Sequence, residues 1–375
     1  WVCAAPSRRR VAQRASSDSH GTNPPGHEPT MHATSPEVTR MSSDAVTQPR
    51  VLLMGTRRGG KSSIQNVVFH RMSPHETLFL ESTNRTIKHD IASSSFLRFE
   101  VWDFPGHLDT ASAAINPDLT YGSGCGALVW VIDAQSDYYE ALSRLQATIA
   151  VAHRINPTIV FEVFLHKVDL FTEDQRVECQ RDVQSHLADE MQTACLGQVK
   201  INFHLTSIYD HSVFEAFSKV AQQLVPQLPS LEKLLDILVT GCRIEKAFLF
   251  DVVSKIYLAT DSSPVDMQSY ELCADMIDVI TDVSSIYGGE EAAEAAPPPA
   301  APGATSSSNC IISLNNGTVL ILREVNRSLA LVCILKSHAL AQQGILEYNF
   351  CCFRDSLSQL FQLTPPAASA ELNHA

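Results

Sequence analysis

The residues best suited to chemistry in this chain lie within residues 55–63. Gly55, Gly60 and Lys61 follow the pattern G-x-x-x-x-G-K-S, with an apolar run before it and a helical pattern after it. In that setting the glycines let backbone N–H groups converge on a phosphate, and the lysine reaches the β- and γ-phosphates. The pattern therefore predicts a phosphate-binding loop rather than a glycine-rich turn with a surface lysine. The expected nucleotide-binding residues are Arg57, Arg58, Gly59, Gly60, Lys61, Ser62 and Ser63.

A magnesium site is expected beside this loop. The hydroxyl of Ser62 is one predicted ligand. Asp103 lies near the end of a strand predicted at residues 96–104 and begins a D-x-x-G pattern. Its carboxylate would hold Mg²⁺ through water, and the N–H of Gly106 would contact the γ-phosphate.

A third metal ligand is expected from the polar loop that follows the first helix. In nucleotide switches, a threonine hydroxyl or backbone carbonyl in this loop completes the Mg²⁺ shell only while the γ-phosphate is present. Thr83 is the predicted residue, and Thr77 and Thr86 are close enough in the sequence to be alternatives.

The sequence also carries a pattern suited to reading a purine base. An apolar run at residues 159–165 ends in His166, Lys167 and Asp169. The aspartate can accept hydrogen bonds from guanine N1–H and the exocyclic amine together, while the lysine stem lies along the base. Adenine offers no such donor pair, so a desolvated Asp169 would penalise it. After a strand expected at residues 200–205, the backbone of Ser207 and Ile208 is expected to support guanine O6.

These residues require a parallel sheet to bring them together. Near-continuous apolar runs at residues 126–133 and 159–165 are typical of parallel strands that are buried on both faces. Helical spacing of apolar residues follows the phosphate-binding loop and recurs after residue 211. We therefore expect a Ras-like α/β domain at residues 50–227.

A second domain is expected at residues 228–362. Its pattern changes to helix, two strands, helix, three strands and helix, without a phosphate loop or a catalytic cluster. That order predicts an α+β dimerisation module. It is interrupted by a low-complexity loop at residues 288–309, for which no role is expected. The segments 1–49 and 363–375 are expected to be disordered tails.

Composition excludes some functions. The net charge of −13 argues against a nucleic-acid partner. The ten cysteines are scattered, as expected for reduced thiols in a cytosolic protein. No apolar run approaches the roughly 20 residues of a membrane span, so no direct membrane insertion is expected.

At this point the chain resembles the Rag GTPases, on the RagC/RagD side of their heterodimer. The resemblance extends over about residues 50–362, and the His-Lys-Val-Asp form at residues 166–169 is its most specific part. The other matching stretches are residues 59–65, 76–84, 102–106, 131–135, 206–212 and 244–276.

The resemblance implies much that the residues alone do not. The second domain would be a roadblock-like (longin-like) domain that pairs with a RagA/RagB-type subunit. The bound cofactors would be GTP or GDP and Mg²⁺. The Ragulator scaffold would recruit this cytoplasmic protein to the lysosomal membrane surface, where it would relay amino-acid availability to TOR complex 1. A GTPase-activating protein such as the folliculin complex is an implied partner, and the nucleus is a further implied location.

Two departures from the family bear on catalysis. His107 stands where the family has the glutamine that orients the attacking water, so intrinsic hydrolysis should be very slow or absent. Residues 108–116 lack the aromatics of the family, so recognition of this second switch by GTPase-activating proteins or effectors is expected to be altered. The expected catalytic residues are His107, Lys61 and Thr83. The alternatives are a nucleotide-binding scaffold subunit that does not hydrolyse GTP and an ATP-dependent enzyme, which Asp169 disfavours.

Overall fold

A computed structural model describes residues 49–91, 99–106, 116–122, 124–287, 309–326 and 328–362. All of them belong to one compact unit, Val46–Ala375. The predictions for His107, for residues 108–115, for the tails up to residue 48 and from residue 363, and for the loop at 288–308 lie outside the described residues.

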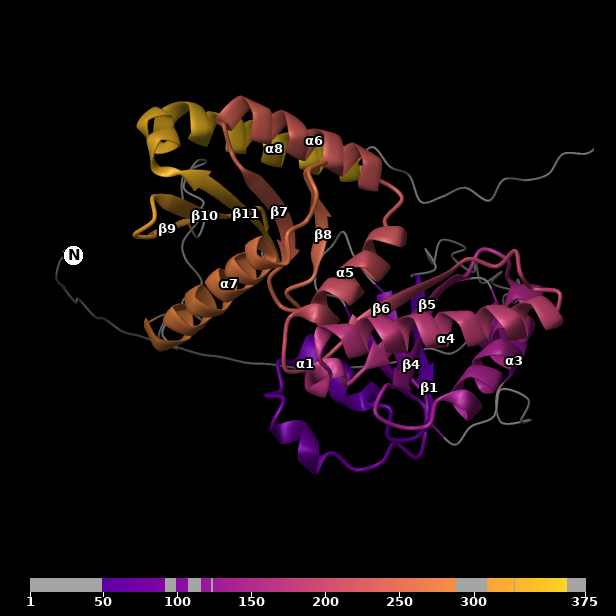
Figure 1. The fold of residues 1–375 in the computed structure, drawn as a ribbon. Helices are drawn as coiled ribbons and strands as arrows, with labels where there is room; N and C mark the ends of the chain where they lie inside the picture. Colours follow the sequence, from indigo (N-terminus) through magenta and orange to yellow (C-terminus); the bar gives the residue numbers. More distant parts are fainter. Residues whose placement is uncertain are drawn as a thin grey trace, which may run out of the picture. The chain divides into compact units, whose positions relative to one another are not determined.

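The first sheet has six strands in the order β2-β3-β1-β4-β5-β6. Strands β1, β3, β4, β5 and β6 are parallel, and β2 pairs antiparallel with β3 (Figure 1). In β4 every residue from the third to the eighth is buried, as the unbroken apolar run predicted. The strands are β1 Arg50–Gly55, β2 Ile87–Ile91, β3 Phe99–Asp103, β4 Cys125–Asp133, β5 Val160–His166 and β6 Ile201–Thr206.

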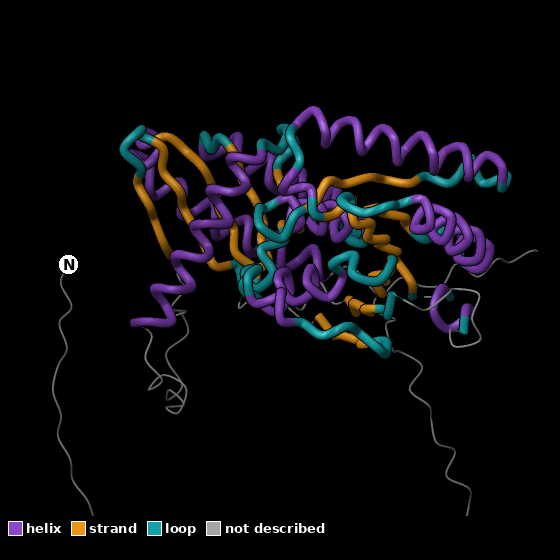
Figure 2. The backbone as a smooth tube through the Cα atoms, turned by 60° about the horizontal axis from the view of Figure 1, so that its bottom comes forward, coloured by secondary structure: helices purple, strands orange, loops and turns teal. Residues whose placement is uncertain are grey.

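Helices cover both faces of this sheet. The buried residues of α1 (Lys61–His70) and α5 (Ser212–Gln223) share a hydrophobic cluster with one face, and those of α3 (Tyr139–Ile155) and α4 (Glu173–Thr193) share a cluster with the other. Shorter elements are α2 (Pro117–Tyr121) and the 3-10 turns Glu76–Phe79 and Val168–Leu170. Figure 2 shows the helices on either side of the strands.

The second sheet is antiparallel, with the order β8-β7-β11-β10-β9. Its elements follow the predicted sequence of helix, two strands, helix, three strands and helix, so the expected fold class is confirmed. The first strand of this sheet in the sequence ends at Asp251, whose carboxylate accepts a hydrogen bond from the Ser254 N–H in a turn. The elements are α6 Leu228–Cys242, β7 Lys246–Asp251, β8 Tyr257–Thr260, α7 Met267–Tyr287, β9 Asn309–Ser313, β10 Thr318–Glu324, β11 Leu329–Lys336, a 3-10 turn Ser337–Gln342 and α8 Gln343–Gln362.

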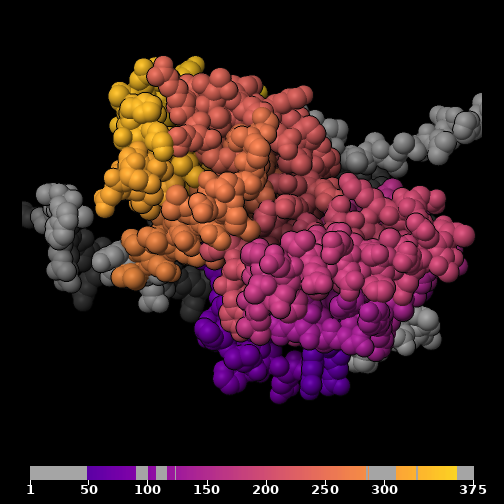
Figure 3. Space-filling model, viewed as in Figure 1, coloured from indigo at the N-terminus to yellow at the C-terminus, as the bar shows by residue number. Residues whose placement is uncertain are grey.

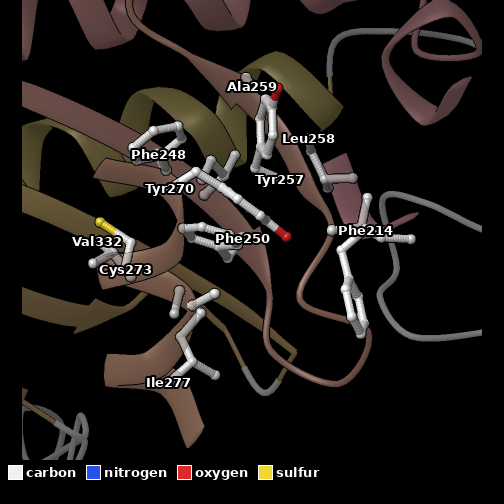
Figure 4. Packing of buried hydrophobic residues seen from close by; sticks show 14 of the residues in the cluster. Phe214, Phe248, Phe250, Tyr257, Leu258, Ala259, Tyr270, Cys273, Ile277 and Val332 are labelled. Atoms are coloured by element: carbon white, nitrogen blue, oxygen red, sulfur yellow. The ribbon is translucent and has the colours of Figure 1, made fainter. Parts of the chain in front are cut away.

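An aromatic cluster lies at the centre of the packing between the second sheet and α7. Phe250 of β7 stacks on Tyr270 of α7 with ring centroids 5.8 Å apart, and Phe248 lies 5.4 Å from Tyr257 of β8 (Figure 4). Large aromatic side chains contribute most to such cores, because each buries a large apolar area. The cluster fixes α7 on one face of the sheet, while α6 and α8 lie side by side on the other (Figure 1). The domain boundary at residues 227 and 228 coincides with the start of α6 and stays a prediction.

Candidate nucleotide-binding site

A cavity of about 450 Å³ lies at the carboxyl ends of the first sheet's parallel strands. Ligands in open α/β sheets bind at this edge. One side of the cavity is formed by the loop after β1 and by the polar loop after α1, and the other by the segments after β5 and β6. Among the residues expected to bind nucleotide, the cavity is lined by Arg57, Arg58, Gly60, Lys61, Ser62, Ser63, Thr83, Gly106, His166, Lys167, Asp169 and Ile208.

The phosphate side of the cavity is built by the loop between β1 and α1. The amino group of Lys61 donates to the carbonyl oxygens of Gly55 and Thr56, at 3.1 and 2.8 Å. Burial lowers the pKa of Lys61 to about 8, with Asp103 acting in the opposite direction. A phosphate at this site would supply a negatively charged partner for the buried ammonium group. Helix α1 begins at Lys61, so its N-terminus adds positive partial charge.

Gly60 lies where the phosphate-binding loop contacts the base-reading side of the cavity. Its φ of +98° is unfavourable for other residues, and a β-carbon there would lie 2.6 Å from Cδ2 of the His166 ring. His166 is almost fully buried, and its Nδ1 lies 3.1 Å from Oγ1 of Thr206. Burial lowers the pKa of His166 to about 4, so the ring is neutral at physiological pH. The close approach explains why a glycine precedes Lys61.

We expect Gly60→Ala to weaken nucleotide binding at least tenfold and to lower the free energy of unfolding by about 1–3 kcal/mol, because the added methyl group displaces His166 and strains the backbone. Thermal unfolding and binding of a fluorescent GDP analogue measure the two effects. Gly344→Ala is the matched control, because a β-carbon there meets nothing within 4 Å in helix α8. The control should be neutral or slightly stabilising. Equal behaviour of the two variants would contradict this account.

Three oxygen-bearing side chains meet beside Lys61. The hydroxyl of Ser62 donates to Oδ2 of Asp103 at 2.6 Å and lies 2.7 Å from Oγ1 of Thr83. The second carboxylate oxygen of Asp103 is buried and has no hydrogen-bond partner among the described residues. Burial raises the pKa of this carboxyl, against the hydrogen bonds from the two hydroxyls and the charge of Lys61. A hard cation fits this set, because it prefers oxygen ligands and stabilises the ionised carboxylate.

The three threonines considered as metal ligands differ in their contacts in the structure. Thr83 contacts both Ser62 and Asp103. Thr77 lines the cavity, but its hydroxyl donates to the carbonyl of Pro74 at 2.7 Å. Thr86 is not among the residues that line the described cavity. The geometry therefore favours Thr83.

The base-reading side is held by hydrogen bonds between loops. Lys167 adopts a left-handed backbone with φ of +67°, and its amino group donates to the carbonyl of Arg58 at 2.9 Å. The hydroxyl of Ser207 donates to Oδ1 of Asp169 at 3.1 Å and accepts a hydrogen bond from the N–H of Tyr209. Ser207 is fully buried, so it orients Asp169 from behind instead of lining the cavity.

Two more expected residues, Gly106 and Gly59, differ in their relation to the cavity: only Gly106 lines it. A β-carbon on Gly106 would lie 2.3 Å from the backbone nitrogen of Arg57, so the D-x-x-G segment packs directly against the phosphate loop. Gly59 does not line the cavity, and its N–H donates to the carbonyl of Thr56.

The sequence analysis missed several residues at the cavity. Gln135 lines it, and its side-chain amide donates to the carbonyl of Lys167 at 2.7 Å. Asp133, at the end of β4, accepts a hydrogen bond from the Lys167 amino group. Asp133 is the last residue of a buried parallel strand and Gln135 lies two residues beyond it, and this position is a signal that could have identified both. Leu78, Leu80, Glu81, Ser82, Leu170 and Tyr209 also line the cavity.

Comparison with known proteins decides which family uses this arrangement. The model of one protein family, described as "Gtr1/RagA G protein conserved region", matches residues 50–277. The chain belongs to the Gtr1/RagA G-protein family. Members of this family are GTP-binding proteins and GTPases, so the nucleotide that the chain binds is a guanine nucleotide.

Relatives within the Gtr1/RagA family fall into two groups according to their sequence identity with this chain. The chain is 55% identical to Ras-related GTP-binding protein C of Mus musculus, over 84% of this chain and 78% of that protein. It is 51% identical to GTP-binding protein gtr2 of Schizosaccharomyces pombe, over 83% of this chain and 98% of that protein. It is 25% identical to gtr1 of the same yeast, over 57% of this chain and 68% of that protein. These similarities indicate a Rag GTPase subunit on the C, D and gtr2 side.

Proposed function

We propose that this chain is the RagC/RagD-type subunit of a heterodimer and that its partner is a RagA/RagB-type subunit. The observation that carries the proposal is the cavity that joins Lys61 to Asp169 in a chain so similar to Ras-related GTP-binding protein C. Co-expression with a RagA/RagB-type subunit, followed by identification of the bound nucleotide, tests it. A stable complex that carries GDP or GTP is expected. A homodimer, or a monomer free of nucleotide, would contradict it.

We further propose that Mg²⁺ occupies the place between Ser62, Thr83 and Asp103. The oxygen ligands and the buried, unpaired oxygen of Asp103 support this choice. When bound, the ion would neutralise charge on the β- and γ-phosphates. The residues of this chain position the ligands: Asp103 supplies the negative charge, and Thr83 brings the loop after α1 to the same place.

An apolar stripe on α7 is the surface we propose for the partner subunit. Val279, Val283 and Ile286 are spaced four and three residues apart, so they share one side of the helix, and all three are exposed. Exposed apolar stripes of this kind mark protein interfaces. Helix α7, coloured orange, lies at the surface of the space-filling view (Figure 3).

Val283→Asp combined with Ile286→Asp is expected to reduce recovery of the heterodimer at least tenfold, because each charge would be buried at the interface. Co-purification through a tag on the partner measures this effect. Ile237→Asp is the control, since Ile237 is 70% exposed, like Ile286 at 71%, but lies on α6. Unchanged recovery of the α7 variant, with nucleotide still bound, would place the interface elsewhere.

Hydrolysis is proposed to be very slow, because His107 is shorter than glutamine and its hydrogen bonds are differently arranged. We expect His107→Gln to raise the single-turnover rate of GTP hydrolysis at least tenfold in the heterodimer. A rate unchanged by this substitution would contradict the explanation. A chain that holds GTP without hydrolysing it, with or without glutamine at this position, would favour the alternative of a scaffold subunit.

We propose that the heterodimer works in the cytoplasm and is recruited to the lysosomal surface by the Ragulator scaffold, with the nucleus as a further location. There it would relay amino-acid availability to TOR complex 1, with an activating protein such as the folliculin complex. The similarity to Ras-related GTP-binding proteins C and D supports this proposal. No helix among the described residues is long and apolar enough to cross a membrane. Loss of the lysosomal pool when the scaffold is removed would test the recruitment.

A further inference from the structure

An aromatic contact joins two loops on opposite sides of the nucleotide cavity. The ring centroids of His75 and Tyr209 lie 5.9 Å apart, with an interplanar angle of 54°. The two residues are separated by 134 positions in the chain, so the contact depends on the fold. Neither side chain belongs to a hydrophobic core, and Tyr209 is 51% exposed. The contact is therefore not needed to fill the interior.

Tyr209 belongs to the segment that positions the base-reading carboxylate. Its N–H donates to the hydroxyl of Ser207 at 3.1 Å, and that hydroxyl donates to Asp169 at 3.1 Å. The side chain of Tyr209 lines the cavity. Tyr209 is thus linked through one residue, Ser207, to the carboxylate that is proposed to read guanine.

His75 begins the segment on the other side. It directly precedes the 3-10 turn Glu76–Phe79, and its carbonyl accepts a hydrogen bond from the N–H of Leu78. The same segment continues through cavity-lining residues to Thr83, which contacts Ser62 and Asp103. The His75 ring therefore ties the loop that carries a metal ligand to the loop that carries the base site.

We propose that the contact between His75 and Tyr209 acts as a latch that slows nucleotide release. A nucleotide in this cavity would lie between the two loops, so their separation would ease its release. The contact between the two rings opposes separation of the loops, and it involves no contact with the phosphates. This inference rests on the proposed function, because it requires a bound guanine nucleotide, but it adds two positioning residues that the phosphate and base patterns do not include.

Aromatic contacts of this kind slow a separation by about three- to tenfold. We therefore expect His75→Ala and Tyr209→Ala each to accelerate release of GDP by about three- to tenfold. Because the two rings act as one unit, the double variant should release GDP no more than about twofold faster than either single variant. Tyr209→Phe keeps the ring and should stay within about twofold of the unchanged protein.

The experiment uses the full chain, purified with its partner subunit and loaded with a fluorescent GDP analogue. Dissociation is followed after addition of excess unlabelled GDP in the presence of Mg²⁺. The matched control is Tyr139→Ala, because Tyr139 is 54% exposed and contacts a histidine, His186, with ring centroids 5.1 Å apart on α3 and α4. This control should leave the release rate unchanged.

The outcomes separate the latch from the function on which it rests. If the unchanged protein binds no guanine nucleotide, the proposed function fails. If it binds GDP but either alanine variant releases GDP at the unchanged rate, only the latch is overturned. A double variant whose acceleration equals the product of the two single effects overturns the latch as well, because the rings would then act independently.

Discussion

Replacing Asp169 by asparagine is expected to weaken binding of GDP and GTP by about a thousandfold and to make xanthine nucleotides the preferred ligands. The carboxylate can accept two hydrogen bonds from the guanine edge, whereas an amide offers one acceptor and one donor group. Each lost charge-assisted hydrogen bond costs about 1.5–3 kcal/mol, and a buried donor without a partner costs more. Xanthine has a carbonyl where guanine has an amine, so it can accept from the new amide group.

Competition between a fluorescent GDP analogue and unlabelled GDP, XDP or ADP measures this change in preference. Asp174→Asn is the matched control, because it removes the same charge from an exposed position in the first turn of α4. The control should keep the preference for GDP. A variant at Asp169 that still prefers GDP over XDP would show that another group reads the base.

Replacing Lys61 by alanine is expected to weaken binding of GTP by about a hundredfold or more. The ammonium group is buried, and among the described residues it donates to the backbone carbonyls of Gly55 and Thr56. Hydrogen bonds from an ammonium group to two phosphates are charge-assisted, so their loss is larger than that of neutral hydrogen bonds. The free energy of unfolding should change little, because burial already disfavours the charged form of this lysine.

Comparison of GTP with guanosine identifies the origin of this loss. Guanosine carries no phosphate, so its weak binding should be the same in the Lys61→Ala variant and in the unchanged protein. Lys219→Ala is the control for loss of a positive charge, because Lys219 is exposed on α5 and pairs with Glu215. If guanosine and GTP were weakened equally by Lys61→Ala, the lysine would support the fold of the cavity and not the phosphates.

Local patterns in the sequence predicted the parts of this site that lie next to each other in the chain. The spacing of Gly55, Gly60 and Lys61 requires a loop between a strand and a helix, and the structure has that loop between β1 and α1. The apolar runs predicted the buried parallel strands, since burial on both faces favours apolar residues at nearly every position. The order of elements in the second domain followed from where each apolar pattern changed its period.

Contacts between distant segments could not be predicted in the same way. The choice among three threonines depended on which one the loop brings to Ser62, and only the fold decides this. The hydrogen bond from Ser207 to Asp169 and the contact of His75 with Tyr209 likewise join loops that are far apart in the sequence. Helices α3 and α4, together with β2, were absent from the predicted elements. Strand β2 is an edge strand that pairs with β3, and α4 has few buried residues, so neither has a strong apolar pattern in the sequence.

The most direct test of the central claim is calorimetric titration of the nucleotide-free protein, purified with its partner subunit, with GDP and with ADP in the presence of Mg²⁺. The cavity that joins the Lys61 ammonium group to the Asp169 carboxylate predicts a dissociation constant for GDP below about 1 μM and binding of ADP weaker by about a thousandfold. Equal affinity for the two nucleotides, or no binding of GDP at micromolar concentration, would contradict the account.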